Sequence, residues 1–212
     1  MEIKNSPDSW NTVWNRIPST FPGSRLLENW YRSIVYFSAF NKLLKSVSLS
    51  QKDVLELGSG TGNNSLYLSR KYPLRSVTLM DFSDSALQRT QEQKFPCKVT
   101  KLHKDLLEFR APLPYGFVHS TGLIEHFYGA ERMAVVQKHA ECVEKNGYVM
   151  IWVPVRSFMF SLIWQFNKMQ GIEEVPLTEQ ELKALCVESG LRIINEGKTA
   201  FGALYGVLAQ KM

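Results

Sequence analysis

The stretch Asp53-Val54-Leu55-Glu56-Leu57-Gly58-Ser59-Gly60-Thr61-Gly62-Asn63-Asn64 decides the fold of this chain. An apolar run with one acidic residue leads into glycines at every second position, and Ser65–Arg70 then has the composition of a helix. This order predicts a β-strand, a tight turn and a helix start. Glycine tolerates positive φ and lets backbone approach a ligand, and the helix N-terminus behind the turn offers free N–H groups. The stretch therefore predicts a nucleotide-like ligand at the carboxyl end of the first strand of an open α/β sheet.

The bulk composition is typical of a single globular domain over residues 1–212. Of the 212 residues, 44% are hydrophobic and 12% aromatic, which suits a buried core and argues against disorder. No apolar stretch reaches the length of a membrane span, since Ile34–Phe40 is too short, and the first residues lack a signal-peptide core. Cys97, Cys142 and Cys186 are widely spaced, so we expect reduced thiols in a cytoplasmic protein.

The charge of the chain is mildly basic. The formal net charge is +5, and the charged residues are scattered along the sequence. Scattered charge is typical of a solvated surface, so we expect no nucleic-acid partner. We expect a monomer or a homodimer, and the sequence leaves that choice open.

Residues 1–50 are expected to form an N-terminal helical cap. The segment Arg25–Lys45 has apolar residues at helical spacing, which predicts one helix or two after a looser start broken at Pro18 and Pro22. We expect this cap to cover one face of the sheet, and its aromatic side chains are also candidates for the roof of a substrate pocket.

Strands and helices are predicted to alternate after the glycine turn. The expected strands are 53–57, 76–80, 97–102, 117–121, 148–153, 191–196 and 203–210, and the expected helices are 63–71, 84–94, 130–145 and 178–189. Ser83 is an expected helix cap, Thr178 with Glu181 forms a capping box, and Asn146-Gly147 is expected to end the third helix. The pattern predicts an α/β fold: a three-layer, doubly wound, mostly parallel seven-stranded sheet with an antiparallel C-terminal edge pair.

The glycine spacing separates two kinds of nucleotide turn. A dinucleotide turn follows the pattern GxGxxG, whereas the glycines here stand at 58, 60 and 62, with Glu56 before the first. With the acids that follow the next strands, this pattern resembles class I S-adenosylmethionine-dependent methyltransferases of the small methyltransferase-domain type. The resemblance covers about residues 50–155 by motif. It implies a Rossmann-like methyltransferase fold, S-adenosylmethionine as cofactor and S-adenosylhomocysteine as product.

The resemblance implies cofactor-binding roles at the first two strand ends. Glu56 matches the acid that faces the methionine end of the cofactor, where a carboxylate suits an ammonium group, and it can also hold N–H groups of the loop. The turn beneath the cofactor is matched by Gly58, Ser59, Gly60, Thr61 and Gly62. Asp81 matches the acid that accepts from both ribose hydroxyls, and Phe82 would lie against the adenine.

Further matches follow the third and fourth strands. Asp105 resembles the acid that accepts from the adenine amino group, and the backbone N–H of Leu106 would donate to the ring. Ser120, Thr121 and Gly122 open a stretch that continues to Phe127 and resembles the Leu-Glu-His stretch of the small-molecule branch of the family. Gly116 departs from the family pattern, which commonly has Asp there.

Two motifs that mark other chemistry are missing from the sequence. The Asn/Asp-Pro-Pro-aromatic stretch of amino-methylating enzymes that act on adenine or glutamine is replaced by Ser120-Thr121-Gly122-Leu123, which disfavours that branch. The four histidines, at positions 103, 119, 126 and 139, lack a convincing metal-ligand spacing, so we expect no metal.

Methyl transfer from a sulfonium needs little from the protein beyond positioning and a dry pocket. A general base is needed only where the acceptor must lose a proton early. His126 is the candidate base because it follows the fourth strand closely, and the alternative is that it packs against or caps the following turn.

The acceptor is expected between the N-terminal cap and a lid-like insertion at 154–176. The candidate substrate-binding residues are Tyr31, Arg32, Arg156, Phe160 and Trp164. The many aromatic residues of the insertion favour a lid over a small, partly apolar or aromatic acceptor methylated on an O or N atom. Sealing of the sheet edge, and contact with a partner or a membrane surface, are the open alternatives.

Other functions remain to be weighed against a small-molecule methyltransferase. A nicotinamide-dependent oxidoreductase is disfavoured by the early third glycine and by Asn63. A methyltransferase-like binding or scaffold module without turnover is disfavoured by the intact set of matched residues. RNA methylation is permitted by the basic charge, but no appended RNA-binding domain is recognised.

Overall fold

A computed structural model describes residues 6–16, 36–90, 94–156, 174–199 and 202–212. The strands are β1 (Asp53–Leu57), β2 (Ser76–Asp81), β3 (Lys98–His103), β4 (Tyr115–Thr121), β5 (Val143–Pro154), β6 (Leu191–Lys198) and β7 (Leu204–Lys211). The α-helices are α1 (Pro7–Arg16), α3 (Phe37–Leu43), α4 (Asn63–Lys71), α5 (Asp84–Thr90), α6 (Ala130–Cys142) and α8 (Glu179–Glu188), and two short 3-10 helices are η2 (Leu44–Ser46) and η3 (Ile124–His126).

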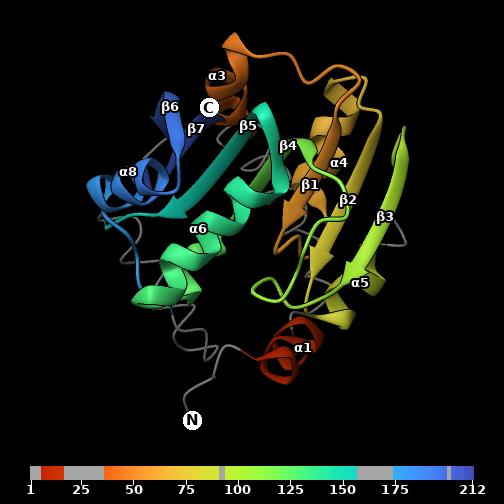
Figure 1. The fold of residues 1–212 in the computed structure, drawn as a ribbon. Helices are drawn as coiled ribbons and strands as arrows, with labels where there is room; N and C mark the ends of the chain where they lie inside the picture. The colour runs from red at the N-terminus through yellow and green to blue at the C-terminus, as the bar shows by residue number, and fades with distance from the viewer. Residues whose placement is uncertain (1–5, 17–35, 91–93, 157–173, 200–201) are drawn as a thin grey trace.

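The strands form one seven-stranded sheet in the order β3-β2-β1-β4-β5-β7-β6 (Figure 1). The pairs among β1 to β5 are parallel, whereas β7 is antiparallel to both β5 and β6. The order reverses between β1 and β4, which is where ligands bind in open α/β sheets, beyond the carboxyl ends of the strands. The predicted doubly wound sheet with its antiparallel C-terminal pair is confirmed.

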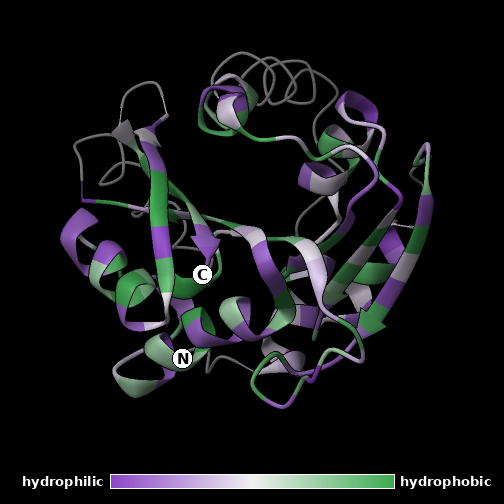
Figure 2. Ribbon diagram, turned by 45° about the horizontal axis from the view of Figure 1, so that its top comes forward, coloured by the Kyte–Doolittle hydropathy of each residue, from purple (hydrophilic) through white to green (hydrophobic). Residues whose placement is uncertain are grey.

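Two apolar cores lie on opposite faces of the sheet. Neighbouring residues of a strand point to opposite faces, and Val54 belongs to one core while Leu55 belongs to the other. The core around Val54 includes side chains of α3, α4 and α5, and the core around Leu55 includes side chains of α6 and α8. Figure 2 shows hydrophobic residues concentrated along the strands between these two layers of helices.

The antiparallel end of the sheet is closely packed around one tryptophan. Trp152 of β5 is 1% exposed and stacks on Phe40 of α3, with ring centroids 5.4 Å apart. Its partner across the strands is Gly206 of β7, where a Cβ atom would overlap the indole ring. Asn195 of β6 ties this end to α3, because its side-chain amide donates to the backbone carbonyl of Leu43 at 2.9 Å.

The predicted end of the third long helix is wrong. We expected a helix over 130–145 that ended at Asn146-Gly147, but α6 ends at Cys142 and β5 begins at Val143. Val143 is fully buried and pairs with Tyr115, so burial of this β-branched residue takes it from the helix into the sheet. The following residues, including Asn146 at φ +62, form an irregularity before regular pairing resumes at Tyr148.

Apart from the start of β5, which lies at 143 where we expected 148, the remaining element boundaries agree within two residues wherever they can be compared. Strand β3 covers 98–103 where we expected 97–102, β4 covers 115–121 where we expected 117–121, and β6 and β7 each extend one or two residues beyond 191–196 and 203–210. The capping box of Thr178 and Glu181 is confirmed at the start of α8. Ser83 Oγ accepts from the N–H of Ala86 at 3.3 Å, which confirms Ser83 as the cap of α5. Residues 91–93 lie outside the described part, so the expected end of this helix at 94 is not tested.

The helix α1 was not predicted as a regular element. The sequence contains a clear start signal, since Ser6 precedes Pro7 and its Oγ accepts from the N–H of Ser9 at 3.4 Å. In Figure 1, α1 lies beyond the arrowheads of β1 and β2, next to α5. It therefore lies at the carboxyl ends of the strands, where a ligand is expected.

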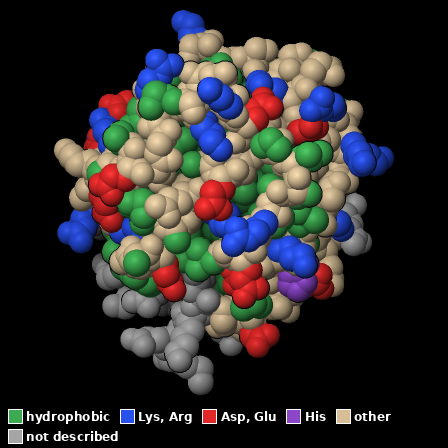
Figure 3. Space-filling model, in the orientation of Figure 1, with side chains coloured by type: hydrophobic (Ala, Val, Ile, Leu, Met, Phe, Trp, Pro, Cys, Tyr) green, Lys and Arg blue, Asp and Glu red, His purple; other side chains and the backbone are tan. Residues whose placement is uncertain are grey.

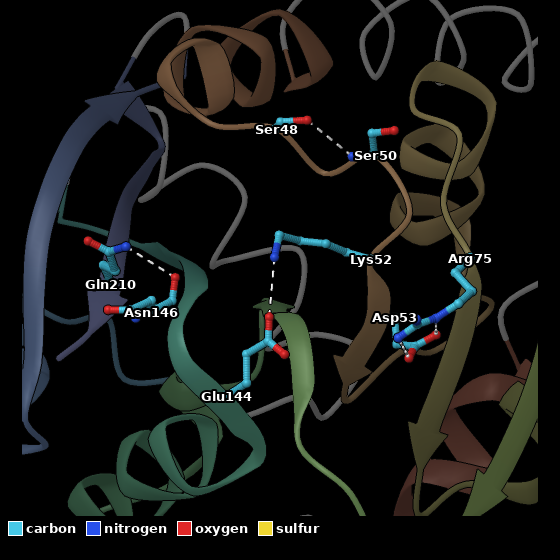
Figure 4. A network of polar contacts seen from close by, with 8 residues as sticks. All are labelled: Ser48, Ser50, Lys52, Asp53, Arg75, Glu144, Asn146 and Gln210. Carbon is cyan, nitrogen blue, oxygen red and sulfur yellow. Dashed lines mark hydrogen bonds and ion pairs between the residues drawn. The ribbon is translucent and has the colours of Figure 1, made fainter.

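Polar contacts also hold the amino ends of the strands, at the opposite side of the sheet from the glycine turn (Figure 4). Asp53 at the start of β1 pairs with Arg75, whose Nε donates to Asp53 Oδ1 at 2.9 Å. Lys52 Nζ lies 3.2 Å from Glu144 Oε1. These contacts join the start of β1 to the residue before β2 and to the start of β5.

The surface carries mixed charge. On the face seen in Figure 3, Lys and Arg side chains lie among acidic ones without forming a single basic patch. Within the described residues, no helix is both long enough and apolar enough to cross a membrane.

Candidate functional site

The glycine turn between β1 and α4 has the backbone conformation that its sequence predicts. Gly58, Gly60 and Gly62 have φ angles of +62°, +53° and +73°, a region that side chains other than glycine rarely adopt. A Cβ atom on Gly58 would lie 2.6 Å from Leu123, and one on Gly60 would lie 2.9 Å from Trp14. The turn therefore needs glycine both for its conformation and for the close approach of its neighbours.

Glu56 is buried at the end of β1 and holds the start of α4. It is 1% exposed, and its carboxylate accepts from the N–H of Ser65 at 3.2 Å and from Asn64 Nδ2 at 3.1 Å. Burial raises the pKa of Glu56 to about 7, against the effect of these hydrogen bonds. The role of holding backbone N–H groups, which we allowed for this residue, is therefore observed.

Asp81 connects the glycine turn to the end of β2. One of its oxygens accepts from the N–H of Gly60 and the other from the N–H of Ser83, both at 2.8 Å. Burial raises its pKa, although these backbone N–H groups act in the opposite direction. A carboxylate has about four acceptor positions, so lone pairs remain for two further donors such as vicinal hydroxyls.

The predicted adenine-binding residues lie at the ends of β2 and β3. Asp105 is exposed, and its Oδ1 accepts from the N–H of Leu107 at 2.8 Å, which stabilises the turn after β3. Leu106 is buried and Phe82 is half-buried. The imidazole Nε2 of His103 lies 3.0 Å from the backbone carbonyl oxygen of Phe82, so the His103 side chain connects the end of β3 to the end of β2.

The end of β4 carries a buried polar pair that sequence reasoning missed. Ser120 is fully buried, and its Oγ lies 2.8 Å from Nε2 of His139 on α6. His119, the preceding residue, lies with Nε2 3.0 Å from Ser65 Oγ on the other face of the sheet. Burial lowers the pKa of His119 to about 3 and that of His139 to about 4, so both imidazoles are neutral at pH 7. The Ser120 side chain is thus directed to α6.

The other two predicted residues, Thr121 and Gly122, lie at the end of β4. Thr121 Oγ1 is buried with no hydrogen-bond partner among the described residues. Gly122 has φ +68° and donates its N–H to the carbonyl of Trp152 at 3.0 Å. The chain therefore turns sharply here and leads into η3.

The helix η3 contains the predicted base and an acidic neighbour. His126 is 9% exposed and Glu125 is 2% exposed. Ligand atoms of these two residues and of Glu174 lie within 4.8 Å of one another. Burial, with a smaller contribution from the nearby Glu174, raises the pKa of Glu125 to about 8. The structure thus brings His126 together with two carboxylates, one of them 48 residues further along the chain.

The helix α1 covers this side of the sheet with two tryptophans. Trp10 meets His126 edge to face, with ring centroids 4.7 Å apart, and Trp14 lies against Gly60. Asn11 Oδ1 accepts from Ser83 Oγ at 2.8 Å, which fixes the helix to the start of α5. These contacts place α1 over the glycine turn and beside His126.

Most predicted acceptor residues cannot be placed. Tyr31, Arg32, Phe160 and Trp164 lie outside the described residues, as does most of the expected insertion at 154–176. Arg156 is exposed. The flanks of the insertion are fixed, since Leu177 donates its N–H to the carbonyl of Pro154 at 3.2 Å.

The arrangement suits a nucleoside ligand with a reactive group near β4. The glycine turn offers backbone close to the ligand, and Asp81 offers a carboxylate at the next strand end. Strand β4 is the neighbour of β1 in the sheet, and the polar groups of η3 follow its carboxyl end. A ligand that spans these strand ends would therefore present its far end to His126.

Comparison with protein families gives a match to the methyltransferase domain family over residues 54–147. This region runs from β1 into β5 and contains the predicted cofactor-binding residues. A comparison with curated protein sequences gave no match.

Solved structures with the same fold include several methyltransferases. Magnesium protoporphyrin IX methyltransferase from Synechocystis PCC 6803 with bound S-adenosylhomocysteine has a TM-score of 0.70 at 15% identity, covering 97% of this chain and 93% of its own. The N-methyltransferase NodS from Bradyrhizobium japonicum WM9, also with S-adenosylhomocysteine, has a TM-score of 0.65 at 12% identity, covering 95% and 97%. An O-methyltransferase family 2 protein from Planctomyces limnophilus in complex with apigenin has a TM-score of 0.66 at 12% identity, covering 89% and 61%.

Proposed function

Because the chain contains a class I S-adenosylmethionine-dependent methyltransferase domain, we propose that it methylates an O or N atom of a small, partly apolar or aromatic molecule. The observation that carries the proposal is the linked pair of the glycine turn and Asp81, joined by the hydrogen bond from Gly60. This pair offers backbone and carboxylate to one nucleoside. Solved structures with this fold include a magnesium protoporphyrin IX methyltransferase and an O-methyltransferase family 2 protein in complex with apigenin, which supports a small molecule as the methyl acceptor.

The proposed cofactor site uses the carboxyl ends of β1, β2, β3 and β4. The turn from Gly58 to Gly62 lies beneath the cofactor, and Asp81 accepts from the ribose hydroxyls. Phe82, Asp105 and Leu106 surround the adenine, and Ser120, Thr121 and Gly122 contribute through the backbone after β4. Glu56 acts mainly by holding the start of α4 in place for the methionine end.

The bound cofactor would supply a methyl group activated by its sulfonium charge. The task of the protein is then to place the acceptor in line and to exclude water. Trp10 and Trp14 are proposed to exclude water from above. In the metal-free protein, His126 is proposed to take the proton of the acceptor as a general base, since it is directed to the same space as Trp10.

The acceptor is proposed to lie between α1 and the insertion at 154–176. Tyr31, Arg32, Phe160 and Trp164 are proposed to contact it, and Arg156 is proposed to hold an anionic group at its exposed position. All three cysteines are free thiols, which suits the reducing cytoplasm that we propose as the location.

A calorimetric titration tests the cofactor directly. We expect S-adenosylmethionine and S-adenosylhomocysteine to bind and NAD not to bind, and a preference for NAD would overturn the proposal. Release of S-adenosylhomocysteine in a screen of phenols, amines and carboxylates then tests turnover. Tight cofactor binding without turnover on any of these would favour the alternative of a binding or scaffold module.

A further inference from the structure

Three side chains with metal-binding chemistry meet beyond the end of β4. Glu125 and His126 are neighbours on η3, and Glu174 comes from the segment that precedes α8. One ligand atom of each lies within 4.8 Å of those of the other two. Among the residues that the structure describes, this is the only group of at least three histidine, cysteine or acidic residues with such spacing.

The carboxylate of Glu125 lacks the partner that a buried charge requires. The residue is 2% exposed, and its Oε2 has no hydrogen-bond partner within the described parts of the chain. A buried polar atom without a partner costs about 1–3 kcal/mol, and more when it is charged. The carboxylate therefore needs either a proton or a cation.

The basic side chain of Arg132, which acts electrostatically on Glu125, forms its hydrogen bonds with other groups. Arg132 donates from Nη1 to Glu181 at 2.5 Å, from Nε to the carbonyl of Phe127 at 3.1 Å and from Nη2 to the carbonyl of Val175 at 3.0 Å. Its guanidinium thus fixes the chain around the cluster, and it gives Glu125 only a longer-range attraction. A positive charge beside the buried Oε2 of Glu125 is therefore favourable.

Backbone contacts hold the two segments together. Val175 donates its N–H to the carbonyl of Glu125 at 3.1 Å, and Leu177 donates to the carbonyl of Pro154 at 3.2 Å. These bonds, with those of Arg132 to Phe127 and Val175, fix Glu174 beside η3. The cluster is therefore built from two anchored segments.

We propose that Glu125, His126 and Glu174 bind one divalent first-row transition-metal cation. Two carboxylates and one imidazole form a mixed oxygen and nitrogen set, which suits Zn²⁺ and Mn²⁺ better than a purely oxygen-preferring ion such as Ca²⁺. Three protein ligands would leave open positions, as catalytic metal sites require. The cation would also neutralise the carboxylate of Glu125.

The position of the site gives the cation a chemical use that rests on the proposed function. The acceptor is proposed to lie beside His126, so its hydroxyl could occupy an open position of the cation. A bound cation lowers the pKa of a coordinated hydroxyl or water. In the metal-loaded protein, His126 would be a ligand. The cation would then lower the pKa of the coordinated hydroxyl, and the acceptor proton would pass to solvent water.

Titration with the cation alone tests the site without any acceptor. Full-length protein without a polyhistidine tag is treated with EDTA, dialysed, and titrated with Zn²⁺ by calorimetry and with Mn²⁺ by electron paramagnetic resonance. We expect one cation per chain, with Zn²⁺ bound more tightly than Mn²⁺. Glu174→Gln should weaken binding by about 30-fold or more.

Matched variants distinguish this site from adventitious binding. Glu125→Gln is expected to weaken binding as Glu174→Gln does, and Glu131→Gln, an exposed acid on the first turn of α6, is expected to leave it unchanged. Because Glu174 is only half-buried, its variant tests the proposal even if Glu125→Gln fails to fold. The absence of saturable binding of both cations, or equal binding by wild type and Glu174→Gln, would overturn the proposal.

The outcome is independent of the proposed methyl transfer. S-adenosylmethionine is titrated into the same EDTA-treated protein. If the cofactor binds and neither cation does, the metal site is refuted and the proposed function is retained. If the cations bind as expected and the cofactor does not, the proposed function fails and the metal site stands.

Discussion

Replacing Asp81 by Asn tests the link between the glycine turn and the cofactor. The two carboxylate oxygens of Asp81 each accept one backbone N–H at 2.8 Å, from Gly60 and from Ser83. An Asn side chain keeps one acceptor oxygen and turns an NH₂ group toward the other N–H. One hydrogen bond to a charged acceptor is therefore lost, and a ribose would meet a neutral group in place of a carboxylate.

The size of the effect follows from these contacts. A hydrogen bond to a charged group contributes about 1.5–3 kcal/mol. We therefore expect binding of S-adenosylmethionine to Asp81→Asn to weaken by about 2–3 kcal/mol, or roughly 30- to 150-fold in Kd. The measurement is isothermal titration calorimetry, with circular dichroism to check that the variant is folded.

The control is the same Asp-to-Asn substitution at Asp53, at the amino end of β1. Asp53 begins β1 as Asp81 ends β2. Its carboxylate is also fully engaged, since it accepts from Arg75 (Figure 4) and from Ser76 Oγ. Asp53→Asn is expected to lower stability slightly and to leave the Kd of the cofactor within about twofold. The reasoning is refuted if Asp81→Asn binds within threefold of wild type, or if both variants lose affinity equally.

Three further predictions concern packing, the roof of the site and pH. Gly206→Ala places a Cβ against the indole of Trp152, so the free energy of unfolding in urea should fall by about 1–3 kcal/mol, while the Kd of the cofactor should not change. Trp14→Ala removes a ring that lies over the glycine turn, so the dissociation rate of S-adenosylmethionine in stopped-flow should rise by about tenfold, near 1.4 kcal/mol, and an unchanged rate would show that α1 does not cover the bound cofactor. Burial lowers the pKa values of His119 and His139 to about 3 and about 4, so the unfolded chain binds protons below about pH 6.5 that the folded protein excludes. The free energy of unfolding should therefore fall between pH 7 and pH 5, by roughly 2 kcal/mol for each of the two histidines. In urea titrations at pH 7 and at pH 5, His139→Gln should lose less of its free energy of unfolding than wild type does.

The cofactor end of the site could be predicted from the sequence because its determinants are local. The conformation of the turn from Gly58 to Gly62 depends on residues adjacent in sequence, and the acid at the end of β2 follows a recognisable strand. Strand and helix order then fixed the sheet, since parallel strands joined by helices allow few arrangements.

The acceptor end depends on contacts between distant residues. Nothing near Glu174 in the sequence indicates that it meets Glu125, because the hydrogen bond from Val175 that places it forms only in the folded chain. Similarly, Ser120 appeared to belong to the cofactor loop, whereas its side chain meets His139 in the layer behind the sheet. The end of α6 was missed because burial of Val143 outweighs the local signal of Asn146-Gly147.

The contact between α3 and the last strands has a consequence for biosynthesis. Asn195 donates to the carbonyl of Leu43, and the strand that carries it lies more than 140 residues later in the chain, at 191–198. During translation, α3 leaves the ribosome long before β6 and β7 exist. Trp152 of β5 and the other residues of its core are made earlier, but α3 lacks its contacts with the C-terminal hairpin until that hairpin emerges. We therefore expect nascent chains stalled before residue 190 to hold α3 in a protease-sensitive state, and the whole protein to reach protease resistance only after the hairpin is released.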